Sequence, residues 1–345
     1  MKQGRILYLD MLRIVATVAV LANHCIMAGI GHYIDDATVT DKIVGYGLVD
    51  VVHFAVPIFV MITGSLLLQP ERKIDFRKVL TKYVWRIVVV ILLIGTFFSW
   101  LELFSTDHSL SLRQVGTALV NTLQGHTWKH FWYLYMLLGL YLVVPILKCV
   151  VEKLSETELD ILIIIGLLFT SVLPAVYNNI GSKLGIQFPI PSVYVFLMLL
   201  GYRLAVIKKS YSNASLMVLI FIIAIAYMGI SILRYGYGHE KLSWFGSYDS
   251  PLMVFYSCVI FLLLKNGHYN EQAFYRVGGG NFSKNAFGIY IFHMLWVHVI
   301  YQVIGFSPVE HGLWTILPVL IVVILLSWVT SIIYGKIPFV GKYIY

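Results

Sequence analysis

An arginine and a histidine lie eleven residues apart in the first apolar stretch of the chain, at Arg13 and His24. At about 100° per residue of α-helix, this spacing puts both side chains on one face, about 16 Å apart along the helix axis. Asp10 and Thr17 fall within about 60° of the same line. A helix surrounded only by lipid does not carry such a stripe, so the stripe indicates a helix that faces a wet cavity.

The polar stripe has two interpretations. In the first, Asp10 and Arg13 form an i,i+3 ion pair that only offsets its own desolvation, and His24 bonds to a backbone carbonyl. In the second, the planar guanidinium of Arg13 holds a phosphate or a carboxylate. His24 then acts as a general base or in acyl transfer, because imidazole titrates near neutral pH. Residue types and spacing alone leave both interpretations open.

The elements that must position this stripe are membrane-spanning helices. Of the 345 residues, 59% are hydrophobic and 12% charged, and the mean hydropathy of +0.83 is far above that of a soluble globular protein. A bilayer core requires about 20 apolar residues of helix. Ten segments approach this length: 6–29, 46–69, 79–101, 131–150, 160–177, 190–207, 213–233, 250–265, 285–304 and 313–335. The sequence therefore predicts an all-α polytopic membrane protein, a bundle of about ten transmembrane helices, with 1–345 as one membrane-embedded domain and no separate soluble domain.

The basic residues predict the orientation of these spans. Counted over alternate connections, 16 Lys and Arg residues lie on the side of the two termini and 6 on the other side, with Arg13, Arg86 and Arg203 left out because they lie within spans. Cytoplasmic connections carry the excess of basic residues, so both termini are expected to be cytoplasmic. The same distribution explains the net charge of +8 without nucleic-acid binding. The first apolar stretch is expected to be a retained span and not a signal peptide.

Four further strings accompany the Arg-x10-His spacing. The second span contains Val-Pro-Ile-Phe-Val-Met-Ile-Thr-Gly at 56–64, the fourth opens with Phe-Trp-Tyr-Leu at 131–134, the sixth contains Gly-Tyr-Arg at 201–203, and the ninth contains Phe-Gly-Ile-Tyr-Ile-Phe-His at 287–293. Together with ten spans, these strings resemble the acyltransferase type 3 family of integral membrane acyltransferases. The resemblance covers essentially the whole chain.

The resemblance implies an enzyme of the plasma membrane that transfers an acyl group, commonly acetyl, from cytoplasmic acetyl-CoA. The implied acceptor is a hydroxyl group of a glycan or a lipid-linked sugar at the outer face. The catalytic residues that it implies are His24 and Arg13, and the polar stripe adds Asp10 as the partner of Arg13. The membrane lipid and the acyl-CoA are the other expected partners.

A basic cluster on the inner side is expected to hold the phosphates of CoA. Its candidate residues are Arg77, Lys82, Arg86 and Arg203. For most of the cluster, positive-inside topology and anionic lipid headgroups are the competing explanation. Arg86 differs, because it lies about one turn inside a span and its charge needs a partner there.

Candidates for the acceptor side are Asp50, His53, Trp132 and His293. Each has an alternative explanation. Asp50 and His53 are compatible with interfacial placement, Trp132 with the aromatic belt of a membrane protein, and His293 with a structural hydrogen bond.

The three cysteines have no metal-ligand spacing, so no metal site is expected. The competing function is a transporter or flippase for a glycan or lipid intermediate, in which the polar stripe lines a permeation path. Acetyl-CoA binding distinguishes the two functions, since a transporter has no reason to hold CoA.

Overall fold

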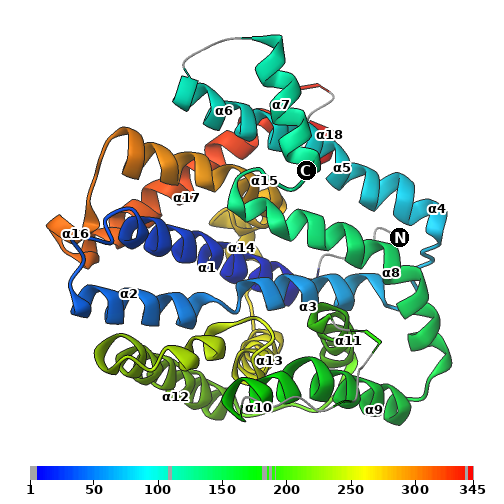
Figure 1. The fold of residues 1–345 in the computed structure, drawn as a ribbon. Coiled ribbons are helices and arrows are strands. Elements are labelled where there is room, and N and C mark those ends of the chain that lie inside the picture. The colour runs from blue at the N-terminus through cyan, green and yellow to red at the C-terminus, as the bar shows by residue number, and fades with distance from the viewer. Residues whose placement is uncertain are drawn as a thin grey trace. The chain divides into compact units, whose positions relative to one another are not determined.

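The computed structural model describes residues 6–107, 111–180, 185, 189–190, 192–338 and 341–344. These residues form helices and their connections, and they contain no β-strand (Figure 1). The predicted all-α class is therefore confirmed.

Within these described residues, nine helices are long and apolar enough to cross a membrane. They are Leu7–Gly31, Val39–Leu67, Phe76–Thr106, Lys129–Lys153, Glu156–Asn178, Asn213–Gly236, Glu240–Lys265, Gly279–Val303 and Leu313–Gly335. The tenth predicted span, 190–207, corresponds to a shorter apolar helix, Val193–Val206. The cytoplasmic placement of the termini stays a prediction.

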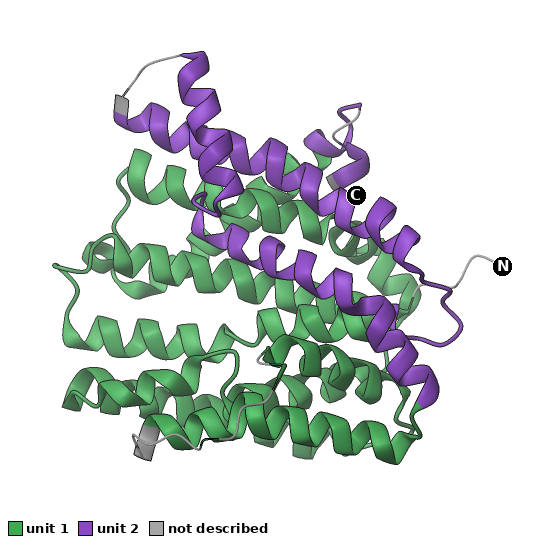
Figure 2. Cartoon of the chain, turned by 45° about the vertical axis from the view of Figure 1, so that its right-hand side comes forward, with its two compact units in different colours: residues 1–66, 154–332 green, residues 67–153, 333–345 purple. Residues whose placement is uncertain are grey.

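The chain divides into two compact units, which are described separately (Figure 2). Unit 1 comprises Met1–Leu66 and Leu154–Ile332, and unit 2 comprises Leu67–Lys153 and Ile333–Tyr345. The helices of unit 1 are α1 (Leu7–Gly31), α2 (Val39–Val52), α3 (Ala55–Leu67), α9 (Glu156–Leu167), η4 (Leu168–Val172), α10 (Leu173–Ile180), α11 (Val193–Val206), α12 (Asn213–Ser231), η5 (Ile232–Gly236), η6 (Glu240–Gly246), α13 (Pro251–Lys265), α14 (Glu271–Arg276), α15 (Gly279–His298), η7 (Val299–Val303), α16 (Pro308–His311), η8 (Leu313–Thr315) and α17 (Ile316–Gly335). Those of unit 2 are α4 (Phe76–Lys78), η1 (Val79–Val84), α5 (Trp85–Val90), η2 (Ile91–Gly95), α6 (Thr96–Asp107), α7 (Leu112–Leu123), η3 (Lys129–Phe131), α8 (Trp132–Lys153) and α18 (Gly341–Ile344). The last residue of α3 and the last three of α17 belong to unit 2.

The second span begins earlier than its hydropathy predicts and is interrupted in its middle. Thr38 and Asp41 form a capping box, in which each side chain accepts a hydrogen bond from the backbone N–H of the other residue. This box starts α2 seven residues before the predicted boundary at 46. His53 and Phe54 then form a turn between α2 and α3. The turn places the ring of His53 at a break in the helix and not on a continuous helical face.

Two glycines let α3 and α11 cross at backbone contact. A Cβ atom on Gly64 of α3 would lie 1.9 Å from the carbonyl oxygen of Met198 on α11, and one on Gly201 of α11 would lie 2.2 Å from the carbonyl oxygen of Met61 on α3. No side-chain rotation relieves either contact, because both partners are backbone atoms. Gly64 and Gly201 lie in two of the strings that carry the family resemblance, and the crossing explains why glycine stands there.

We expect Gly64→Ala to push α3 away from α11 and to lower the free energy of unfolding by about 1–3 kcal/mol, the usual cost of overpacking. The measurement is the apparent melting temperature of the purified protein in detergent. The matched control is Gly229→Ala on α12, where an added Cβ meets nothing within 4 Å. Alanine favours helix over glycine, so the control should melt at an equal or higher temperature. Equal melting temperatures for Gly64→Ala and the wild type would contradict the close crossing.

Candidate active site

The two histidines singled out in the first and ninth spans meet between α1 and α15 of unit 1. Their ring centroids, in His24 and His293, are 5.0 Å apart with an interplanar angle of 42°. The side chain of His293 is fully buried, whereas that of His24 is half-buried. Nδ1 of His293 lies 2.5 Å from the carbonyl oxygen of Tyr290. Because a carbonyl can only accept, this contact assigns the ring proton to Nδ1, in the tautomer whose Nε2 carries the lone pair.

A second polar contact joins the same two helices nearer the N-terminus of α1. Oδ1 of Asp10 accepts hydrogen bonds from Nη1 of Arg13 at 2.8 Å and from Oγ of Ser283 at 2.6 Å. Asp10 is fully buried and Ser283 nearly so, while 29% of the Arg13 side chain is exposed. The carboxylate therefore fixes Nη1 of Arg13, while part of the Arg13 side chain remains exposed.

These two contacts show that α1 and α15 run in the same direction. Asp10 faces Ser283, and His24, further along α1, faces His293, further along α15. α1 and α15 pack on each other (Figure 1). The contact of Asp10 with Arg13 and Ser283 lies toward the N-terminal ends of the two helices, and the contact of His24 with His293, the histidine level, lies toward their C-terminal ends. Among the predicted site residues, this arrangement pairs Asp10 with Arg13 and His24 with His293, at two separate levels of the same helix pair.

The break in the second span carries the next two predicted residues. Nδ1 of His53 donates to the carbonyl oxygen of Gly246 at 2.6 Å, and its ring centroid lies 4.2 Å from that of Tyr248. Asp50 is buried, and its Oδ2 accepts from Nη1 of Arg234 at 3.2 Å. A Cβ on Gly246 would lie 2.1 Å from Oδ1 of Asp50. The backbone of η6 at Gly246 therefore contacts Asp50 directly, and its carbonyl group binds His53.

Of the residues predicted to hold phosphate, three lie in unit 2 and have unlike surroundings. Arg77 on α4 and Lys82 on η1 are exposed. Arg86 on α5 is half-buried, and its Nε donates to the carbonyl oxygen of Tyr343 on α18 at 2.8 Å. Arg86 therefore fastens the C-terminal helix to α5. Trp132, at the start of α8, is 38% exposed.

The fourth predicted phosphate ligand, Arg203 on α11, lies in unit 1 and is held by two carboxylates. Its Nε and Nη2 donate to the two oxygens of Asp160 at 2.6 and 3.0 Å. Nη2 also lies 3.1 Å from Oε2 of Glu156. A bidentate pair of this kind ties α11 to α9, so the contacts of Arg203 favour a structural role over a phosphate site.

A family profile described as an acyltransferase domain, that of the acyltransferase 3 family, matches residues 6–332 and thus almost the whole chain. The chain belongs to the acyltransferase 3 family. It is therefore a membrane acyltransferase with multiple membrane-spanning helices. The resemblance that the sequence strings suggested is confirmed. Neither the curated proteins nor the solved structures contain a match to this acyltransferase.

Sequence reasoning missed two partners within this acyltransferase. Ser283, in the second turn of α15, was not recognised as the residue that bonds Asp10. Arg234 falls one residue beyond the predicted span 213–233, but it lies on the π-helical turn η5 that continues the helix, with only 12% of its side chain exposed. The signal for Arg234 was present, because a basic residue directly after an apolar run needs a carboxylate once the helix continues past it.

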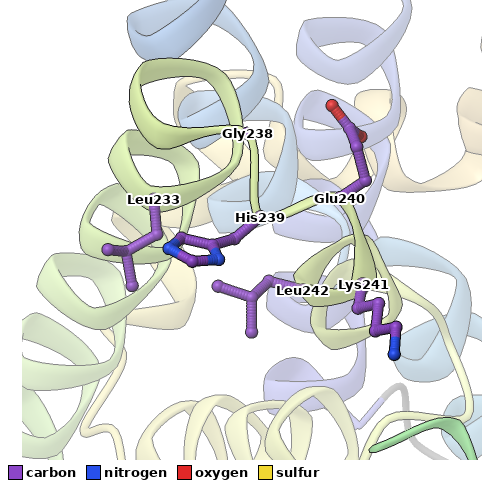
Figure 3. Close-up of a pocket in the computed structure, with 6 residues that line it drawn as sticks. All are labelled: Leu233, Gly238, His239, Glu240, Lys241 and Leu242. Atoms are coloured by element: carbon purple, nitrogen blue, oxygen red, sulfur yellow. The ribbon is translucent and has the colours of Figure 1, made fainter.

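A pocket lies between η5 and η6, just after α12, and none of the predicted site residues lines it. Its volume is about 530 Å³, and it is lined by Leu233, Gly238, His239, Glu240, Lys241 and Leu242 (Figure 3). In the close-up, Leu233, His239 and Leu242 gather on one side of the loop, while the carboxylate of Glu240 points away from them. The pocket comes from one short stretch of chain and carries no catalytic arrangement.

We expect Ser283→Ala to reduce acyl transfer about tenfold or more, since a hydrogen bond to a charged group contributes about 1.5–3 kcal/mol. Without the hydroxyl, Asp10 no longer fixes the guanidinium of Arg13 in one orientation. The measurement is the rate of acyl transfer, together with the melting temperature. The control is Ser257→Ala on α13, a fully buried serine that donates only to a carbonyl of its own helix, that of Met253 at 2.8 Å. Similar activity in both variants would show that Ser283 only fills space.

Proposed function

We propose that this acyltransferase moves an acetyl group from cytoplasmic acetyl-CoA to a hydroxyl group of a glycan or lipid-linked sugar at the plasma membrane. The observation that carries the proposal is the contact of His24 with His293 on the helix pair that also holds Asp10, Arg13 and Ser283. One helix pair then supplies both a nitrogen base and a cation. An O-acyl transfer can use a base at the acceptor hydroxyl and a cation that holds another part of the long acyl-CoA donor.

In the proposed reaction, Nε2 of His24 takes the proton of the acceptor hydroxyl as its oxygen attacks the thioester carbonyl. A C–O bond forms and the C–S bond breaks. The thiolate of CoA leaves and takes the proton from the imidazolium, so the products are an ester and free CoA. An alternative order, in which Nε2 itself carries the acetyl group before the hydroxyl attacks, uses the same residues. In either order, His293, whose ring packs against that of His24, is proposed to hold the ring of His24 in place.

The roles of the charged residues follow from their exposure. Arg13 is held by Asp10 but is partly exposed, so its guanidinium is proposed to hold an oxygen of the donor. Arg77 and Lys82 of unit 2 are exposed and are proposed to contact the phosphates of CoA. Asp50, His53 and Trp132 remain proposals for the acceptor side. For Asp50 and His53 the supporting observation is the helix break beside η6.

The test is transfer of radiolabelled acetyl from acetyl-CoA in inverted membrane vesicles that contain the protein. We expect label in the glycan and lipid-linked sugar fraction, and we expect mild alkali to release it, because oxygen esters are alkali-labile. Vesicles with the His24→Ala variant are the control. Label that stays after alkali, or that appears equally with the variant, would exclude the proposed O-acyl transfer. Movement of an unmodified glycan across the vesicle membrane without acetylation would support a transporter instead.

A further inference from the structure

The helix α7 lies between two spans of unit 2 and is fixed in place at both ends. It follows the span Phe76–Thr106, precedes the span Lys129–Lys153 and packs on α6 (Figure 1). Ser111 caps its start, accepting from the backbone N–H of Gln114 at 3.2 Å. Near its end, the hydroxyl of Tyr135 on α8 donates to the carbonyl oxygen of Thr122 at 2.5 Å. α7 is therefore an ordered element of the membrane protein and not a free loop.

The twelve residues of α7 form three distinct faces. A narrow line of Gln114, Ala118 and Thr122, spaced four residues apart, is buried within unit 2. The polar face beside it carries Arg113 and Thr117, which are exposed. The third face is apolar and also exposed, with the following residues and exposed fractions: Leu112 92%, Val115 46%, Leu119 39%, Val120 51% and Leu123 66%.

The apolar face of α7 requires a partner that is not water. Burying apolar surface is favourable by about 25 cal/mol per Å², and five large aliphatic side chains on one side of a short helix form a contiguous patch. The helix beside it, α6, and the preceding η2 expose Phe97 and Leu93 in the same way on a membrane span. α7 therefore packs beside a span that itself exposes large apolar side chains.

We propose that α7 is an in-plane interfacial helix whose apolar face is seated in the hydrocarbon of the bilayer, while Arg113 and Thr117 face water. Helices with one apolar and one polar face and with little net hydrophobicity lie at the membrane boundary in this way. The short connections to the spans on either side keep α7 at the membrane surface. Three spans precede it, so it lies on the face opposite to the N-terminus. The proposal is independent of the acyl-transfer reaction.

The test compares spin labels on the two exposed faces of α7 in the full-length protein in phosphatidylcholine vesicles. Labels are attached to Leu119→Cys on the apolar face and to Thr117→Cys on the polar face. Each labelled cysteine is introduced into a cysteine-free background, a variant with Cys25→Ala, Cys149→Ser and Cys258→Ala, so that no native thiol is labelled. Leu142→Cys on α8, an exposed position of a membrane span, is the lipid-facing standard. Collision rates with molecular oxygen report lipid, and those with a water-soluble nickel chelate report water.

We expect the label at 119 to resemble the label at 142, with a ratio of oxygen to nickel collisions several-fold above that at 117. Nickel collisions at 119 as frequent as those at 117 would place the face in water and overturn the proposal. A label at 119 that neither reagent reaches would mean that protein, such as a second copy of the chain, covers the face, and would overturn it too. If the cysteine-free background does not fold, a diazirine phospholipid crosslinked to the unmodified protein gives the same comparison, with modification expected at Leu119 and Leu123 and not at Thr117.

Discussion

We expect His24→Ala to abolish acyl transfer and to leave acetyl-CoA binding intact. A positioned general base contributes about 10²–10⁴-fold to the rate, so the loss should fall in or beyond this range. The half-buried ring faces His293 at 5.0 Å and is the proposed site of proton or acyl transfer, whereas no phosphate contact is assigned to it. The measurements are kcat in the radiolabel assay and the Kd of acetyl-CoA by calorimetry on the same preparation.

The matched control for this prediction is His32→Ala. His32 is an exposed histidine directly after α1, where its ring packs on Tyr33 with centroids 4.8 Å apart. It should transfer acetyl at the wild-type rate. Near wild-type transfer by His24→Ala would show that His24 is not a catalytic residue. Parallel loss of binding and transfer, with a lower melting temperature, would show that the ring of His24 supports the packing of α1 on α15 and not the reaction.

Hydropathy predicted the spans because the property that it measures also determines the fold. Ten apolar segments were expected, and nine long helices and one short one lie at those places in the described chain. The boundaries were less predictable where capping chemistry extends a helix beyond its apolar core. The capping box of Thr38 and Asp41 lies in a polar connection, so a hydropathy profile does not include it in the span. π-helical turns such as η5 and η7 leave no hydropathy signal at all.

Helical periodicity predicted one face of the site but not its partners. The stripe of Asp10, Arg13 and His24 follows from 3.6 residues per turn within one helix, so a single sequence contains it. The partners Ser283 and His293 come from α15, more than 250 residues away. Only tertiary packing decides which faces of two spans meet. The string before His293 pointed to that residue through family resemblance, whereas an isolated serine gives no such signal.

The phosphate candidates show the limit of counting charges. Arg77, Lys82, Arg86 and Arg203 are all basic residues in or beside predicted spans, and Arg86 and Arg203 lie within them. In the structure, two are exposed, one bonds a backbone carbonyl and one is held by two carboxylates. The difference lies in partners that are distant in the chain. Topology rules explain Arg77 and Lys82 at the end of a span, but they do not separate a phosphate ligand from a structural contact for any of the four residues.

Arg13→Lys is expected to lower acyl transfer by about tenfold to a hundredfold, although the substitution keeps the positive charge. The guanidinium is a planar fork, so it can bond Oδ1 of Asp10 with one nitrogen and a donor oxygen with another. An ammonium group is a single point of charge and cannot hold both oxygens in one plane. The loss corresponds to one hydrogen bond between charged groups, about 1.5–3 kcal/mol. The measurement is kcat/KM for acetyl-CoA, with the melting temperature as the check on folding.

The double variant Asp10→Asn with Arg13→Gln separates catalysis from folding at this position. Removing only one member of a buried pair leaves an uncompensated charge in the membrane, so each single neutral variant should melt at a lower temperature than the wild type. The double variant removes both charges and should regain the melting temperature, since the two side chains are coupled through Oδ1 of Asp10. It should remain without acyl transfer, because an amide has no positive charge to hold the donor. Normal transfer by the double variant would show that Asp10 and Arg13 form only a structural ion pair, and that the reaction depends on the histidine level of α1 and α15 alone.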